Sequence, residues 1–349
     1  MRNILILLIL IGFTAPLSAQ EPITITMANV FGDTPEGRMP THTPRIQELF
    51  AAKVDEYTDG QVKWNILRGK QQGGISVFRS PGLTAEGDQI QATNVPAFFL
   101  PRVPEIGIQS IPFLFDGAEH SRRFMNSEPA NWLSKKIEET YGVKVLGHFY
   151  NAAFISVNGV TPIREPEDFA DKIVNGFDKS WAPIWTNIVP KERRFIGTQD
   201  AWTGALVKPD SDFDINIGMI QNNHRQRLHE RFKHTTLVEN FYNIFYTMMI
   251  NRYIWDGMTD FQRAGIEKAV KEAQNASIAY QLDTTLWALQ LNQSEGTEMH
   301  ILTSDERARW KAEFYPKMLD AVAEKSANPS ETREMIKKIE ALADDLRWQ

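Results

Sequence analysis

Apolar residues recur along this chain with two different spacings. Short runs rich in β-branched and aromatic residues predict strands. These runs cover residues 23–30, 61–67, 89–95, 143–150, 151–158, 172–177, 213–220 and 240–251. Apolar positions at helical spacing predict helices over 43–58, 118–139, 179–188, 200–206, 222–233, 304–325 and 330–346, and Pro129 leaves open a break within the second of them. The alternation of the two patterns predicts an α/β fold.

One predicted helix is much longer than the others. Thr259 and Gln262 have the spacing of a capping box, in which each side chain bonds the backbone of the other residue. The helical pattern that follows continues to about residue 292 and is ended by Gly296. A helix of roughly 34 residues is about 50 Å long, which is enough to lie along two domains.

The stretch 143–177 organises the rest of the chain. It contains three strand-like segments with only one turn cluster and one short polar helix between them. This pattern predicts a crossing between two α/β halves. Ligands of α/β folds bind at the carboxyl ends of strands, beside a switch in strand order. Phe154 and Asn175 are therefore the first candidates for a binding site.

The first residues have the pattern of a secretory signal peptide. Arg2 precedes the apolar run Ile4–Phe13, and small residues follow up to Ala19. Cleavage after Ala19 leaves about 330 of the 349 residues, which predicts two domains of ordinary size. The chain has no cysteine, and large cores can be stable without disulfides. Export without cysteine predicts a periplasmic protein.

Charge and motifs exclude several function classes. The net charge of −6 argues against a nucleic-acid partner, which would favour a basic face. His224, His229 and His234 are spaced by five, whereas two metal ligands on one helix favour spacings of three or four. Neither an HExxH nor a GxSxG motif is present. We therefore expect no metal, no cofactor and no enzymatic activity, and we interpret the basic run 224–234 as a solvated helix face or a docking surface.

Four stretches share their pattern with one family. Residues 111–120 join an apolar Pro-Phe-Leu-Phe run to a helix start, and residues 142–177 form a strand-rich central stretch. Residues 69–74 form a glycine-rich loop that contains Gln71, and residues 249–273 combine a strand, a turn and the start of the long helix. Taken in their order along the chain, these four stretches resemble the solute-binding proteins of TRAP transporters, and the resemblance covers nearly all of the chain after the signal peptide.

This resemblance implies a two-lobed clamp of the periplasmic-binding-protein type (type II), with the long helix spanning both lobes. Residues 1–19 would be the signal peptide. Residues 20–149 with 243–349 would form lobe I, and residues 150–242 would form lobe II. Such a protein captures a small solute between its lobes and delivers it to a membrane permease. It needs no cofactor, because the ligand itself shifts the balance between open and closed forms.

Differences from the family predict the ligand. Members that carry carboxylates place arginines at the positions of Asn175 and Phe154, and an Asn-Pro pair at Gln221 and Asn222. An asparagine offers a donor and an acceptor without charge, whereas a guanidinium binds a carboxylate through two bonds. We therefore expect a ligand that is neutral or largely apolar, held by aromatic faces and amides.

The expected lining combines aromatic and amide side chains from both lobes. It comprises Phe31, Gln71, Tyr150, Phe154, Asn175, Phe177, Trp181, Trp185, Trp202, Gln221, Asn222 and Tyr242. Arg193 and Arg194 leave open a carboxylate clamp from another direction. Two other functions also remain open at this stage: a secreted two-lobed hydrolase, and a binding protein that serves a sensor.

Overall fold

The computed structural model describes residues 21–28, 42–67, 74–96, 99–175, 207–208 and 210–344. Within these residues one 8-stranded mixed sheet has the strand order β2-β1-β3-β7-β4-β6-β5, with β8 beside β7. The strands are β1 Ile23–Ala28, β2 Val62–Leu67, β3 Ala92–Pro96, β4 Val143–Gly159, β5 Val174–Asn175, β6 Ile215–Met219, β7 His234–Asn251 and β8 Glu298–Ile301.

Helices of two kinds surround the sheet. The α-helices are α1 His42–Tyr57, α2 Ser80–Glu86, α3 Ala118–Met125, α4 Glu128–Tyr141, α7 Ile220–Arg225, α8 Arg252–Gly257, α9 Asp260–Ser294, α10 Ser304–Lys325 and α11 Pro329–Ala341. The 3₁₀ helices are η3 Pro104–Ser110, η4 Pro166–Phe169 and η6 Leu228–Glu230. In the described part of the chain, no helix is long and apolar enough to cross a membrane.

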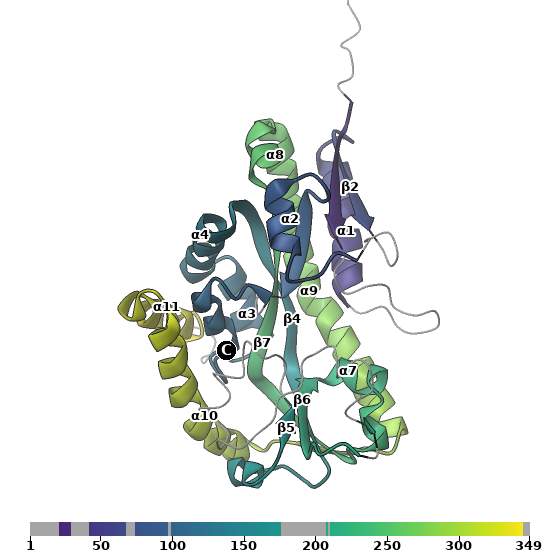
Figure 1. The fold of residues 1–349 in the computed structure, drawn as a ribbon, viewed down its shortest axis with the longest axis vertical. Coiled ribbons are helices and arrows are strands. Elements are labelled where there is room, and N and C mark those ends of the chain that lie inside the picture. The colour runs from purple at the N-terminus through teal and green to yellow at the C-terminus, as the bar shows by residue number, and fades with distance from the viewer. Residues whose placement is uncertain are drawn as a thin grey trace, which may run out of the picture.

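Two long antiparallel strands, β4 and β7, connect the two ends of the molecule (Figure 1). At one end β3 pairs with the last residues of β7, and β1 and β2 continue the sheet. At the other end β6 pairs with the last residues of β4, and β5 pairs with β6. We call the end with β1, β2 and β3 the first part and the end with β5 and β6 the second part.

The pairing of β4 with β7 is interrupted where the two parts meet. The register moves from Ala152 opposite Ile244 to Phe154 opposite Glu239, so residues 240–243 of β7 face a single residue of β4. Asn240 adopts a left-handed conformation with φ of 56°, and its carbonyl accepts a 2.8 Å hydrogen bond from the backbone N–H of Phe113. Extra residues of this kind bend a strand locally.

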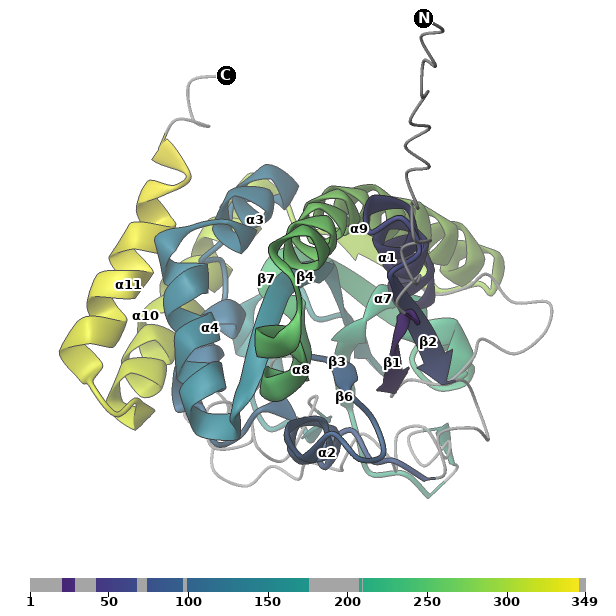
Figure 2. The same ribbon diagram turned by 90° about the horizontal axis from the view of Figure 1, so that it is seen from above.

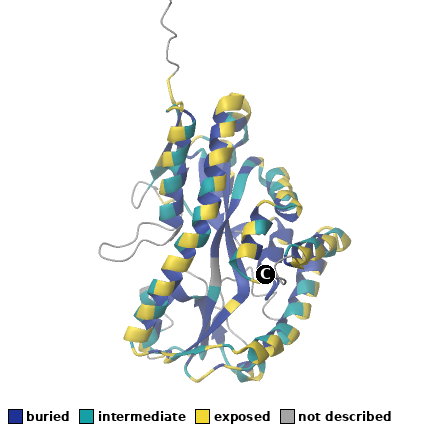
Figure 3. Cartoon of the chain, turned by 180° about the vertical axis from the view of Figure 1, so that it is seen from behind, coloured by how far each residue is buried: buried dark blue, intermediate teal, exposed yellow. Residues whose placement is uncertain are grey.

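Helix α9 lies along both parts of the molecule on the same face as α1, whereas α2 lies on the opposite face (Figure 2). Its exposed residues point outward, and the sheet beneath it is almost wholly buried (Figure 3). The capping box of Thr259 and Gln262 is present, and it confirms the predicted start of this helix. One contiguous hydrophobic core extends from Ile25 in the first part to Ile215 in the second.

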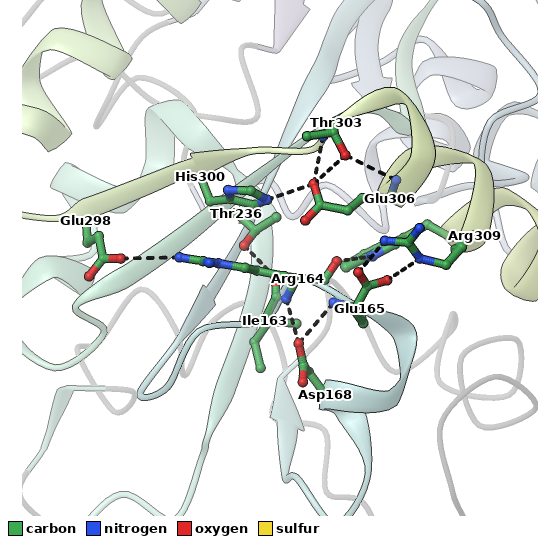
Figure 4. Close-up of polar contacts among 11 residues, drawn as sticks. Ile163, Arg164, Glu165, Asp168, Thr236, Glu298, His300, Thr303, Glu306 and Arg309 are labelled. Atoms are coloured by element: carbon green, nitrogen blue, oxygen red, sulfur yellow. Dashed lines mark hydrogen bonds and ion pairs between the residues drawn. The ribbon is translucent and has the colours of Figure 1, made fainter.

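Helix α10 attaches to the second part through the loop after β4 (Figure 4). Arg309 of α10 bonds the carboxylate of Glu165 through two guanidinium nitrogens, one of them at 2.7 Å. Trp310 donates from its indole nitrogen to the carbonyl oxygen of Arg164 at 2.8 Å. Asp168 closes the loop by accepting from the backbone nitrogens of Arg164 and Glu165 at 2.7 and 2.9 Å.

Three sequence predictions need correction. The separate strands predicted at 143–150 and 151–158 form one strand, because the chain contains a register irregularity there instead of a turn. The single helix predicted over 222–233 is broken, since Arg227 adopts a left-handed conformation between α7 and η6. Strand β7 begins at His234, six residues before the predicted 240. The helices predicted at 179–188 and 200–206, and the signal peptide at 1–19, lie outside the described residues.

Candidate functional site

Asparagines form a row across the strands of the second part. Asn175 of β5 lies opposite Asn216 of β6, and Asn216 lies opposite Asn158 of β4. Side chains that face each other across neighbouring strands point to the same side of the sheet. We call Asn175, Asn216 and Asn158 the asparagine row, and all three are buried.

Hydrogen bonds fix most of this row. Asn175 donates from Nδ2 to Oδ1 of Asn216 at 2.7 Å. Asn158 accepts at Oδ1 from Nδ2 of Asn223 at 2.7 Å and from the hydroxyl of Thr235 at 2.8 Å. The inner end of the row is therefore satisfied and serves the fold. At the outer end, Oδ1 of Asn175 is buried and has no hydrogen-bond partner among the described residues.

A second cluster connects the first part to the second. Thr43 near the start of α1 donates from its hydroxyl to Oδ1 of Asn151 on β4 at 3.4 Å. The amide of Asn151 and the amide of Gln221 both approach the sulfur of Met219, at 3.5 and 3.4 Å. We call Thr43, Asn151, Met219 and Gln221 the bridging cluster. Its contacts are long and uncharged, so they can be exchanged at little cost for contacts with another molecule.

More buried amides lie on the strands and helices that meet at the crossing of β4 and β7. Gln47 of α1, Asn94 of β3 and Asn243 of β7 have side-chain atoms without a hydrogen-bond partner within the described ranges. Leaving such a buried group unsatisfied costs about 1–3 kcal/mol, so each of them needs a water or a ligand. Sequence reasoning missed these three residues and Asn151. The available signal was a polar residue inside an otherwise apolar strand.

Phe154 belongs to a different environment from Asn175. Its half-buried ring packs against a small apolar cluster of Ile220, Leu237 and Ala288, which lies under the long helix α9. Asn175 instead lies on β5, the edge strand of the sheet, whereas β4, which carries Phe154, is an interior strand. The two residues that the sequence selects together thus lie on strands separated by β6.

The two tyrosines of the predicted lining are core residues. Tyr150 packs edge-on against Phe245, with ring centroids 6.0 Å apart, and Tyr242 packs against Phe241 at the same centroid distance. Burial raises the pKa of both phenols. Both rings belong to the main hydrophobic core, as Phe149 does. Asn222 is 8% exposed, and its backbone carbonyl accepts from the N–H of Gln226 within the turn after α7.

Half of the predicted lining lies outside the described residues, as do the two arginines that left a carboxylate clamp open. These residues are Phe31, Gln71, Phe177, Trp181, Trp185, Trp202, Arg193 and Arg194. Among the described candidates, Gln221 is joined to the bridging cluster and Asn175 ends the asparagine row. These two residues occupy the ends of neighbouring elements, at β6–α7 and β5.

Comparison with known proteins identifies the fold. Residues 33–172 and 217–325 match the sequence profile of DctP, bacterial extracellular solute-binding protein, family 7. The C4-dicarboxylate-binding periplasmic protein DctP of Rhodobacter capsulatus is 26% identical over 320 residues, which cover 87% of this chain and 88% of the relative.

Two solved structures share the whole architecture. A TRAP periplasmic solute-binding protein from Ochrobactrum anthropi, with its C-terminus bound in the ligand-binding pocket, superposes with a TM-score of 0.77 at 22% identity, covering 94% of this chain and 99% of that chain. Another from Desulfovibrio desulfuricans, with bound sn-glycerol-3-phosphate, gives 0.76 at 16% identity, covering 92% and 97%. The α/β sheet with its two connecting strands is thus the two-lobed clamp that the sequence predicts. The family profile matches more than half of the chain, and the chain belongs to family 7 of the bacterial extracellular solute-binding proteins, the solute-binding components of TRAP transporters.

Proposed function

We propose that this protein captures a small organic solute, neutral or largely apolar, between its two lobes and delivers it to the membrane permease of a TRAP transporter. It acts in the periplasm after residues 1–19 are removed. Lobe I comprises residues 20–149 and 243–349, and lobe II comprises residues 150–242. The solute contacts the outer end of the asparagine row and the bridging cluster.

The sheet supports this division into lobes. The proposed boundaries, 149/150 and 242/243, coincide with the stretch in which β4 and β7 lose their regular pairing. Strands β1, β2 and β3 fall in lobe I, and β5 and β6 fall in lobe II. The chain after α9 returns to the second lobe, since β8 pairs with residues 234–237 of β7. The bridging cluster joins Thr43 of lobe I to Gln221 of lobe II, so a solute placed there touches both lobes at once. A ligand that contacts both lobes only in the closed form favours closure.

The observation that carries the ligand class is the buried Oδ1 of Asn175, which lacks a partner among the described residues. An amide oxygen accepts a hydrogen bond and repels an anion. The named residues of the row and the bridging cluster offer amide, hydroxyl and thioether groups, and none of them carries a positive charge. A solute with a hydroxyl or N–H donor and an apolar body matches this set better than a carboxylate does.

The charge of the ligand is tested by changing the charge of the site. Asn175→Arg and Asn175→Asp place opposite charges at one buried position. For a neutral solute, both variants should weaken binding at least tenfold, about 1.4 kcal/mol, because each buries an unpaired charge. Isothermal titration calorimetry against a panel of neutral alcohols, amides, aromatic compounds and small carboxylates gives the measurement.

Asn131 supplies the matched control, because it is exposed on α4. Asn131→Arg and Asn131→Asp should bind the solute as the unchanged protein does. Tighter binding by Asn175→Arg, together with loss of binding by Asn175→Asp, would identify an anionic solute and overturn the ligand class. Thermal unfolding of every variant separates weakened binding from a failure to fold.

A further inference from the structure

Two histidines and one glutamate converge where α7, η6 and the end of α9 meet. His224 is on α7, His229 is on η6, and Glu295 is the C-cap of α9. One ligand atom from each lies within 4.8 Å of the others. Nδ1 of His224 contacts one carboxylate oxygen of Glu295, and Nδ1 of His229 lies 3.0 Å from the other.

The break in the chain at Arg227 builds this arrangement. A spacing of five places two histidines on different faces of a straight helix, which is why the sequence argued against a metal pair. Arg227 instead adopts a left-handed conformation with φ of 58° between α7 and η6. The turn brings the imidazoles into a stacked arrangement, with centroids 6.3 Å apart and an interplanar angle of 14°. The objection from spacing therefore does not hold for the folded chain.

The three side chains are sheltered, and only part of the cluster is hydrogen-bonded. Nδ1 of His224 forms a hydrogen bond with one carboxylate oxygen of Glu295, whereas the contact of Glu295 with His229 is not satisfied. The side chains of His224, His229 and Glu295 are 30%, 22% and 15% exposed. Nδ1 of His229 and the nearer carboxylate oxygen of Glu295 are both buried, and despite their 3.0 Å separation they do not have the geometry of a hydrogen bond. Two lone-pair donors that face each other without a hydrogen bond are suited to a cation between them.

We propose that His224, His229 and Glu295 bind one zinc ion, or a divalent transition metal of similar preference. Two imidazole nitrogens and one carboxylate oxygen, with a fourth position left to water, form a ligand set that zinc uses. Calcium and magnesium favour sites made wholly of oxygen, so the two histidines select against them. Tetrahedral zinc bonds of about 2.0–2.2 Å place neighbouring ligand atoms about 3.4 Å apart. The carboxylate of Glu295 must therefore move away from both imidazole nitrogens to admit the ion, a small side-chain adjustment in a cluster whose ligand atoms already lie within 4.8 Å of one another.

Zinc at this position would tie the second lobe to the end of the long helix. Helix α7 follows directly after β6, and it carries Gln221 of the bridging cluster. The metal would join this helix to the C-cap of α9, two elements that are far apart in sequence. Because the metal binds the folded chain and not the unfolded one, it would also stabilise the fold.

The test uses untagged full-length mature protein that has been stripped of metal with a chelator. Zinc is titrated by calorimetry and by competition with a chromophoric chelator, and thermal unfolding is followed with and without zinc. The unchanged protein should bind one zinc per chain and unfold at a higher temperature with the metal. His224→Gln, His229→Gln and Glu295→Gln should each weaken zinc binding at least tenfold.

Two histidines outside the cluster provide matched controls. His234 pairs with Glu298, and His300 pairs with Glu306, each as a single histidine with a single glutamate. His234→Gln and His300→Gln should bind zinc as the unchanged protein does. The absence of stoichiometric zinc binding, or equal binding by the cluster variants and the controls, would overturn the proposal.

Cobalt substitution provides a readout that does not depend on any variant folding. Cobalt bound to the unchanged protein should give the visible absorption of a four-coordinate site with nitrogen and oxygen ligands, and zinc should displace it. A six-coordinate spectrum, as in water, would contradict the proposed ligand set. If one cluster variant fails to fold, the remaining two and this spectrum still decide the question.

Discussion

At the residue scale, His148 shows how burial governs protonation. Its side chain is buried on β4. Its Nδ1 lies 3.0 Å from the hydroxyl of Thr247, and its Nε2 lies 2.9 Å from the hydroxyl of Ser134. The loss of solvent lowers its pKa from 6.5 to about 4, although the carbonyl of Ala130 opposes this shift slightly. The folded protein therefore holds this imidazole neutral at pH values where the unfolded chain protonates it.

This shift makes stability depend on pH. Between pH 6.5 and 4 the unfolded state binds more protons than the folded state at His148, so stability falls as the pH falls. Relative to its value above pH 6.5, the free energy of unfolding is therefore lower by about 2 kcal/mol at pH 5. Urea unfolding of the unchanged protein and of His148→Gln at pH 7 and pH 5 measures the effect. The variant is expected to be less stable at pH 7 but to lose less on acidification, and parallel losses in the two proteins would contradict this account.

The same scale shows what the sequence can predict about a site. Asn175 could be found because it ends a short strand in a recognisable stretch, and the structure places it at the end of β5. Asn94 and Asn243 carried only a weak signal, as single amides inside strand-like apolar runs. Their importance comes from unsatisfied amide atoms, which depend on neighbours that are remote in sequence. The role of Phe154 was equally hidden, because its packing partners come from α7, β7 and α9.

At the element scale, the contact of α9 with α1 depends on one glycine. A Cβ atom at Gly265 would lie 2.7 Å from a methyl group of Thr58 and 2.8 Å from the backbone oxygen of Tyr57. The threonine side chain can rotate, but the backbone oxygen at the end of α1 cannot move without shifting the helix. The absence of a side chain at this position therefore sets how closely the two helices approach.

Gly265→Ala should destabilise the protein. Overpacking costs typically 1–3 kcal/mol, and the gain in helix propensity of about 1 kcal/mol offsets part of that. A net loss of about 1–2 kcal/mol is expected in urea unfolding. Gly257→Ala in α8 is the matched control, because a Cβ there meets nothing within 4 Å. A Gly265→Ala variant as stable as that control would mean that the helices separate freely.

The sequence predicts those helices and strands whose start or end is determined by residues close by in the chain. The long helix α9 was predicted because Thr259 and Gln262 close a capping box at its first turn. The division of β4 was wrong because two strand-like runs meet without any turn residue between them. The break between α7 and η6 was missed because Arg227, a residue without special turn preference, adopts the left-handed conformation. Tertiary packing of Leu228 and Phe232 against Phe213 accompanies that turn.

At the scale of the whole molecule, two lobes share one continuous sheet. Among the described strands, only β4 and β7 reach from the first part of the sheet to the second. Helix α9 runs beside these strands on one face of the sheet and contacts α1 of the first part and α7 of the second (Figure 1). Relative movement of the lobes must therefore bend β4 and β7. Bending around Asn240 disrupts the fewest hydrogen bonds between these strands, because their regular pairing is lost there.

Closure can be measured directly, because the chain has no cysteine and two introduced cysteines are labelled uniquely. Lys63 on β2 and Glu167 in η4 are exposed and lie in different lobes of the proposed division. Double electron–electron resonance (DEER) between spin labels at these positions should show a shorter and narrower distance distribution when a solute from the calorimetric panel is bound. Labels at Lys63 and Gln89, both in lobe I, should keep their distance, because a hinge leaves each lobe rigid. If a solute binds by calorimetry but changes neither distance, this protein recognises its ligand without closing. If both distances change equally, the bending lies inside lobe I and not at the crossing of β4 and β7.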